Sequence, residues 1–179
     1  MAELRKDTFK NVEEMNEVII KNIITTLNKG DLLYVLGDIC WNSQMTEIAL
    51  KRLCNHGIQL YLIEGNHDKR ISTKIKEKYF SKIYKGLHVI NDGSIRITLT
   101  HFPLLSWSRS YADSWQLYGH IHIMSAEKPF IENVLCGKAL NVNVEFNNYK
   151  PWSLKEIAVY MSKRRSNRDA EMFKKNKEV

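Results

Sequence analysis

"YLIEGNHDKR", residues 61–70, is the stretch that decides how this chain folds. Its first residues form an apolar run typical of a buried strand, and the run passes directly into Gly65, Asn66, His67 and Asp68. These four residues cannot continue a buried strand, whereas amide, imidazole and carboxylate groups are all able to bind a metal ion. A functional site is therefore expected where this strand ends.

Three further apolar segments end in the same manner. "DLLYVLGD" (31–38) ends in Asp38, "GSIRITLTH" (93–101) ends in His101, and "WQLYGHIH" (115–122) ends in His120 and His122. In open α/β sheets, ligands bind beyond the carboxyl ends of the strands. The polar side chains of all four segments are therefore expected to converge.

Helical patterns alternate with these strands. Asn11 with Glu14 predicts the cap of a first helix, Gly30 predicts its end, and a second helix is predicted over Gln44–Asn55. Asp92 with Gly93 predicts a hairpin turn, and residues 139–146 ("ALNVNVEF") predict a further strand. Ser153 with Glu156 predicts the cap of a last helix. The order favours an α/β domain with a mixed or layered sheet.

The composition suits one soluble domain. The chain has 179 residues, of which 44% are hydrophobic and 26% are charged. No apolar run approaches the roughly 20 residues of a membrane span, and "MAELRKDTFK" lacks the apolar stretch of a signal peptide. Cys40, Cys54 and Cys136 are odd in number and show no metal-finger spacing, which indicates a reducing compartment. A cytoplasmic location without a membrane partner is predicted.

The net charge of +7 is concentrated at the end of the chain. Residues 150–179 contain nine Lys or Arg against four Asp or Glu, which leaves +5 in this segment. We therefore predict a single domain over residues 1–163 and a basic tail over 164–179. The tail could contact a nucleic-acid backbone, but it lacks the interleaved aromatic residues of a base-stacking surface.

The donor groups of the four segments define a type of metal site. Imidazole, carboxylate and amide oxygen together favour a divalent ion such as manganese, iron, zinc, cobalt or nickel over calcium. Four of the six histidines lie in these segments.

The ordered motifs resemble those of the calcineurin-like metallophosphoesterase family. They are "GD" (37–38), "GNHD" (65–68), "TH" (100–101) and "GHIH" (119–122), and the resemblance extends from Phe9 to Ile157. In that family the motifs run D-x-H, G-D, G-N-H-[DE], a lone His and G-H-x-H, each at a strand end of a four-layer α/β/β/α sandwich. The resemblance implies a metal-dependent phosphoesterase that hydrolyses a phosphomonoester or phosphodiester by metal-activated water.

Carried over by position, the resemblance assigns roles to individual residues. Asp38 would bridge two metal ions, Asn66, His101 and His120 would complete one site, and His122 would belong to the other. His67 would protonate the leaving oxygen instead of binding metal. Manganese is the expected ion.

One motif of the family has no counterpart. The nearest string to the opening D-x-H is "DTF" (7–9), in which Phe cannot bind a metal, and the first strand of the family is expected to be missing. Three explanations stay open: the sequence lacks a segment, the protein works with one complete metal site, or catalysis has been lost. We expect tight metal binding at the first site and weak or no binding at the second.

Two further expectations follow from the missing strand. Its absence would expose the edge of a sheet, and a homodimer through that edge is one expected arrangement. Loss of the D-x-H also favours, as the alternative function, a noncatalytic scaffold that binds a partner. A nucleic-acid-binding module that uses the basic tail is the third hypothesis.

Overall fold

The computed structural model describes residues 8–39, 43–135 and 137–166. Within these ranges the helices and strands follow one another as α1 (Val12–Thr26), β1 (Leu32–Val35), α2 (Ser43–Asn55), β2 (Gln59–Ile63), α3 (Thr73–Tyr79), β3 (Lys82–Tyr84), β4 (Leu87–Asp92), β5 (Ile95–Thr100), β6 (Trp115–Tyr118), α4 (Lys128–Val134), β7 (Ala139–Asn141) and α5 (Leu154–Ser162). Two short 3₁₀ turns, η2 (Asp68–Arg70) and η3 (Val144–Asn147), follow β2 and β7.

The strands form two separate sheets. The first is parallel with the order β1-β2-β3, and the second has the order β4-β5-β6-β7. In the second sheet β4 and β5 are an antiparallel hairpin, whereas β5, β6 and β7 run parallel to one another. The long connections between β5, β6 and β7 are what parallel pairing requires.

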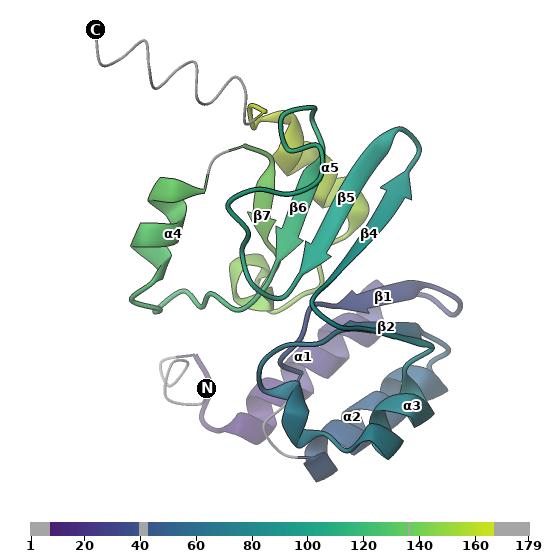
Figure 1. The fold of residues 1–179 in the computed structure, drawn as a ribbon. Helices are drawn as coiled ribbons and strands as arrows, with labels where there is room; N and C mark the ends of the chain where they lie inside the picture. The colour runs from purple at the N-terminus through teal and green to yellow at the C-terminus, as the bar shows by residue number, and fades with distance from the viewer. Residues whose placement is uncertain (1–7, 40–42, 136, 167–179) are drawn as a thin grey trace, which may run out of the picture.

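The elements stack in layers (Figure 1). Helices α1, α2 and α3 cover the outer face of the first sheet, where Ile20, Leu50, Leu60 and Phe80 belong to one buried cluster. In the second sheet, α5 packs against one face through Ile157 and Met161, and the loop that carries the buried Trp107 packs on the other face, together with Ile131 of α4. This arrangement confirms the predicted α/β/β/α sandwich.

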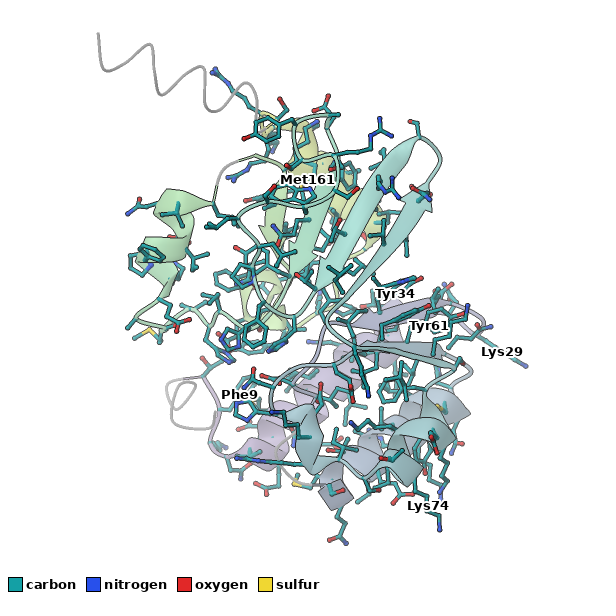
Figure 2. All side chains as sticks on the ribbon, in the orientation of Figure 1. Phe9, Lys29, Tyr34, Tyr61, Lys74 and Met161 are labelled. Atoms are coloured by element: carbon teal, nitrogen blue, oxygen red, sulfur yellow. The ribbon has the colours of Figure 1, made fainter. Side chains whose placement is uncertain are left out.

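A central core joins the two sheets. It contains Leu36 and Ile63 from the ends of β1 and β2, Ile97 and Leu117 from the second sheet, and the fully buried Met161 of α5 (Figure 2). The carboxyl ends of strands from both sheets are therefore held at the same place by apolar packing.

Local signals in the sequence correctly predicted several boundaries. The Asn11 side chain accepts a hydrogen bond from the Glu14 N–H at 2.8 Å and caps α1. Ser153 and Glu156 form the complete reciprocal capping box at the start of α5. Gly93, with φ of 56°, makes the turn between β4 and β5. Each of these signals depends only on residues close in sequence.

Other predictions were wrong in detail. The apolar segment 31–38 has the pattern of a buried strand, but β1 lies at the edge of the described sheet and its residue Leu32 is 41% exposed. The alternating segment 139–146 forms a strand only over β7 and then turns into η3. Strand β3 and helix α4 were not predicted, because each is a short element with little periodicity.

Several predictions fall partly outside the described residues. Cys40, Cys136 and residues 167–179 of the predicted tail lie outside them, while Cys54 is a partly buried free thiol. The boundary between domain and tail stays a prediction. None of the helices that the structure describes is long and apolar enough to cross a membrane.

Candidate metal and catalytic site

Asp38 lies directly after β1 in an unusual backbone conformation. Its φ is 55°, in the left-handed region, and the preceding Gly37 has φ of 85°. A Cβ on Gly37 would lie only 2.6 Å from the backbone of Gly65 and 2.6 Å from His101 Nδ1. The segments that follow β1, β2 and β5 thus approach one another so closely that position 37 has room only for glycine.

The side chain of Asp68 links the segments that follow β1 and β2 by hydrogen bonds. Its carboxylate is fully buried and accepts hydrogen bonds from the N–H groups of Asp38 (3.0 Å), Ile39 (3.2 Å) and Gly65 (2.8 Å). The carboxylate of Asp38 in turn accepts from the His67 N–H at 2.8 Å. The "GD" and "GNHD" motifs therefore form one hydrogen-bonded unit that presents Asp38 and Asn66.

His101 is 1% exposed and its ring orientation is fixed from behind. Nδ1 lies 2.7 Å from the Leu36 carbonyl oxygen, which can only accept, so Nδ1 carries a proton. Nε2 faces Asn66 Oδ1 at 2.8 Å and Asp38 Oδ2 at 3.3 Å. When the ring is neutral, Nε2 directs a lone pair at these two oxygen atoms, which also carry lone pairs; when the ring is protonated, Nε2 donates to them.

His120 completes the cluster from the end of β6. Its φ is 62°, and its Nδ1 lies 3.2 Å from His101 Nε2. The donor atoms of Asp38, His101 and His120 all lie within 4.8 Å of one another, so that they could hold a metal ion. A cation among these lone pairs would remove the repulsion between them, and the mixed nitrogen and oxygen set fits a divalent transition metal.

The ionisation of the cluster reflects the same crowding. Burial alone would raise the pKa of Asp38, but hydrogen bonds from His101 and the His67 N–H, with the charges of both imidazoles, hold it below its ordinary value. Burial alone would lower the pKa of His101, but Asp38 and the Leu36 carbonyl raise it. The pKa of His120 is lowered by burial and by His101. The surroundings therefore favour the charged forms of Asp38 and His101 and the neutral form of His120.

His67 lies beside the cluster without joining it. Its side chain is partly exposed, and its imidazole is close enough to Asp38 to lower the pKa of that carboxyl group. Its backbone leads into η2, of which it is the N-cap residue.

His122 is held apart from the other predicted ligands. Among the described residues, the metal-binding group of Asp38, His101 and His120 does not include it. Its Nδ1 lies 2.6 Å from Oε1 of Glu145, whose side chain is only 4% exposed. Sequence reasoning missed Glu145, although its place in "NVNVE" (141–145), an alternation of polar residues at a buried site, was a usable signal.

Comparison with known proteins agrees with this geometry. The sequence matches the family described as calcineurin-like phosphoesterase over residues 5–124. It is 33% identical over 156 residues to an uncharacterised protein of Methanocaldococcus jannaschii, across 87% of this chain and 80% of that protein. The crystal structure of a protein of unknown function from Aquifex aeolicus is similar with a TM-score of 0.68 and 26% identity, covering 89% of this chain and 90% of its own. With its strand-end motifs in the family's order and its Asp and His side chains gathered between two sheets, the chain belongs to the calcineurin-like phosphoesterase family.

Proposed function

We propose that this chain is a metal-dependent phosphoesterase that hydrolyses a phosphomonoester or a phosphodiester. The observation that supports the proposal most directly is the convergence of the Asp38 carboxylate, the Asn66 amide oxygen and the His101 and His120 rings. The family binds divalent metals, and this donor set is suited to one.

Asp38, Asn66, His101 and His120 would hold the ion, with manganese as our first choice and iron, zinc, cobalt or nickel as chemically similar alternatives. When bound, such an ion withdraws charge from a phosphoryl oxygen and makes water a better nucleophile. His122 would serve a second ion together with Asp38.

The other residues of the site have roles of their own. His67 would donate a proton to the oxygen that leaves the phosphorus atom, because its ring is partly exposed beside the cluster. Asp68 would keep the "GD" and "GNHD" turns in register through its three backbone hydrogen bonds.

A noncatalytic scaffold that binds a partner is the second candidate. The observation in its favour is that the sequence contains no Asp-x-His, the motif that opens the pattern of this family. Since one fold serves many functions, a retained core with an incomplete metal set is compatible with loss of catalysis.

Hydrolysis assays separate the two candidates. The chelated protein, reloaded with manganese, is assayed with p-nitrophenyl phosphate and bis(p-nitrophenyl) phosphate. We expect turnover that disappears on chelation and in Asp38→Asn but persists in the control Asp92→Asn, which alters an exposed residue of the β4–β5 hairpin. Equal release of nitrophenol by the protein and by Asp38→Asn would exclude the proposed enzyme.

Location and partners belong to the same proposal. We propose a cytoplasmic enzyme whose principal partner is its phosphate-ester substrate, because the cysteine pattern suits a reducing compartment. Among the strands that the structure describes, β1 lies at an edge of its sheet, and a second copy of the chain would pair there. Contact of the basic tail with nucleic acid stays a secondary hypothesis, testable by the salt dependence of binding.

A further inference from the structure

Three alternate residues, the last residue of β7 and two that follow it, lie against the "GHIH" loop that follows β6. Asn141 Nδ2 donates to the Ile121 carbonyl oxygen at 2.7 Å, and Asn143 Nδ2 lies 3.3 Å from His122 Nδ1. Glu145 contacts His122 and the Ile123 N–H. The alternation of polar residues in "NVNVE" (141–145) thus directs three polar side chains to the "GHIH" loop. This is why the alternation continues beyond Asn141, where β7 ends.

Glu145 makes the shortest of these contacts. Oε1 lies 2.6 Å from His122 Nδ1, and Oε2 accepts from the Ile123 N–H at 3.0 Å, so both oxygens are used on adjacent residues of the loop. The backbone of Glu145 is itself fixed, because its N–H donates to Asn143 Oδ1 at 3.2 Å at the start of η3. A carboxylate that is buried and anchored in this manner has little freedom to swing away from the ring.

The contact determines which nitrogen of His122 carries the proton. A carboxylate can only accept hydrogen bonds, so Nδ1 is the donor and the neutral ring keeps its lone pair on Nε2. The neighbouring Asn143 amide is farther from Nδ1 than the carboxylate, and its oxygen is already occupied by the Glu145 N–H. A histidine whose second nitrogen donates to a carboxylate is a better and better-oriented metal ligand.

We propose that Glu145 is a positioning residue that holds His122 as its Nδ1–H tautomer and keeps Nε2 available to a divalent cation. The assignment of His122 to a cation rests on the proposed function, whereas the tautomer is a property of the metal-free chain. Glu145 would therefore strengthen the weaker of the two expected metal sites without touching substrate.

Nitrogen NMR of the metal-free, ¹⁵N-labelled protein tests the tautomer directly, at a pH at which the ring is neutral. In the long-range ¹H–¹⁵N spectrum we expect the His122 resonances, assigned by their loss in His122→Ala, to show a protonated Nδ1 and an unprotonated Nε2. Glu145→Gln should shift the ring toward the Nε2–H form, because the Gln amide can donate to Nδ1. The control Glu132→Gln, on the exposed side of α4, should leave the spectrum unchanged.

Two results would overturn the positioning role. One is a wild-type ring that is predominantly Nε2–H; the other is a Glu145→Gln spectrum identical to that of the wild type. If Glu145→Gln does not fold, the wild-type spectrum alone still decides.

Manganese titration followed by electron paramagnetic resonance gives the second readout. Glu145→Gln should weaken binding of the ion that His122 holds by about 10–100-fold, and leave the ion held with His101 nearly unchanged. Equal affinities in the two proteins would contradict the role of Glu145. Complete absence of manganese binding in the wild type would instead contradict the proposed function, and the tautomer result would then be judged separately.

Discussion

The Asp68 carboxylate accepts a hydrogen bond from the backbone N–H of Asp38 at 3.0 Å, which joins two turns that follow different strands. Asp38 needs this support because its backbone occupies the left-handed region, which is costly for a residue with a side chain. The buried carboxylate thus holds the central donor of the cluster in a conformation that the local sequence would not maintain.

Asp68→Asn should lower the free energy of unfolding by about 2–4 kcal/mol, since an amide oxygen cannot accept all three backbone N–H groups and its NH₂ group would face donors. Urea denaturation measures the change. Asp92→Asn is the matched control, because Asp92 is exposed at the end of β4, and it should change the value by less than about 0.5 kcal/mol. Similar losses in both variants would show that Asp68 is not the connection between the turns.

Gly37→Ala should destabilise the protein by about 1–3 kcal/mol more than Gly86→Ala. Both glycines have positive φ, 85° and 81°, so the backbone strain is matched. A Cβ at residue 86 meets nothing within 4 Å, whereas at residue 37 it would meet the Gly65 backbone at 2.6 Å. Thermal denaturation of the two variants isolates the clash, and equal melting temperatures would contradict the close approach of the strand ends.

His67→Ala should reduce kcat by about 10²–10⁴-fold while metal content and stability stay unchanged, because the ring is proposed to supply a proton and not to hold the ion. Steady-state kinetics with elemental analysis measure both quantities. His56→Ala is the control, because His56 follows α2 and contacts the Leu27 carbonyl instead of the metal-binding cluster. Loss of metal from His67→Ala would mean that His67 is a ligand.

Saturation with manganese followed by removal of excess should leave about one ion per chain, because the described cluster of Asp38, His101 and His120 serves one ion. His101→Ala should lose that ion. Elemental analysis on weighed protein gives the ratio. A value near two would show that another group replaces the missing Asp-x-His, and would strengthen the case for catalysis.

The capping box of α5 predicts a dependence of stability on pH. Hydrogen bonds from the Ser153 hydroxyl and the Ser153 N–H lower the pKa of Glu156. A lowered folded-state pKa means that the contribution is fully present above the unfolded value of about 4.3 and is lost as pH falls through the folded value. Glu156→Gln should therefore cost about 0.3–1 kcal/mol at pH 7 and almost nothing near pH 2. The melting temperatures of the wild type and of Glu156→Gln are compared across this pH range. A difference that is the same at every pH would exclude a contribution from the charged Glu156 side chain.

Local patterns were sufficient for much of the fold. Asn11, Ser153 and the Asp92-Gly93 turn act on residues only a few positions away, so their effects could be predicted without tertiary contacts. The short elements β3 and α4 were missed because their formation depends on neighbours distant in sequence: β3 pairs with β2, and α4 contributes Ile131 to the cluster around Trp107.

The sequence by itself determined that polar side chains follow four apolar strands, because each motif consists of consecutive residues directly after an apolar segment. Only the tertiary structure decided that these ends come from two different sheets and meet over a shared core. It also decided that Asp38, Asn66, His101 and His120 gather while His122 turns to Glu145. The physical reason is that the packing of the two sheets, and hydrogen bonds such as that between Asp68 and the Asp38 N–H, join residues that are far apart in sequence. A local sequence pattern cannot predict the distances between such residues.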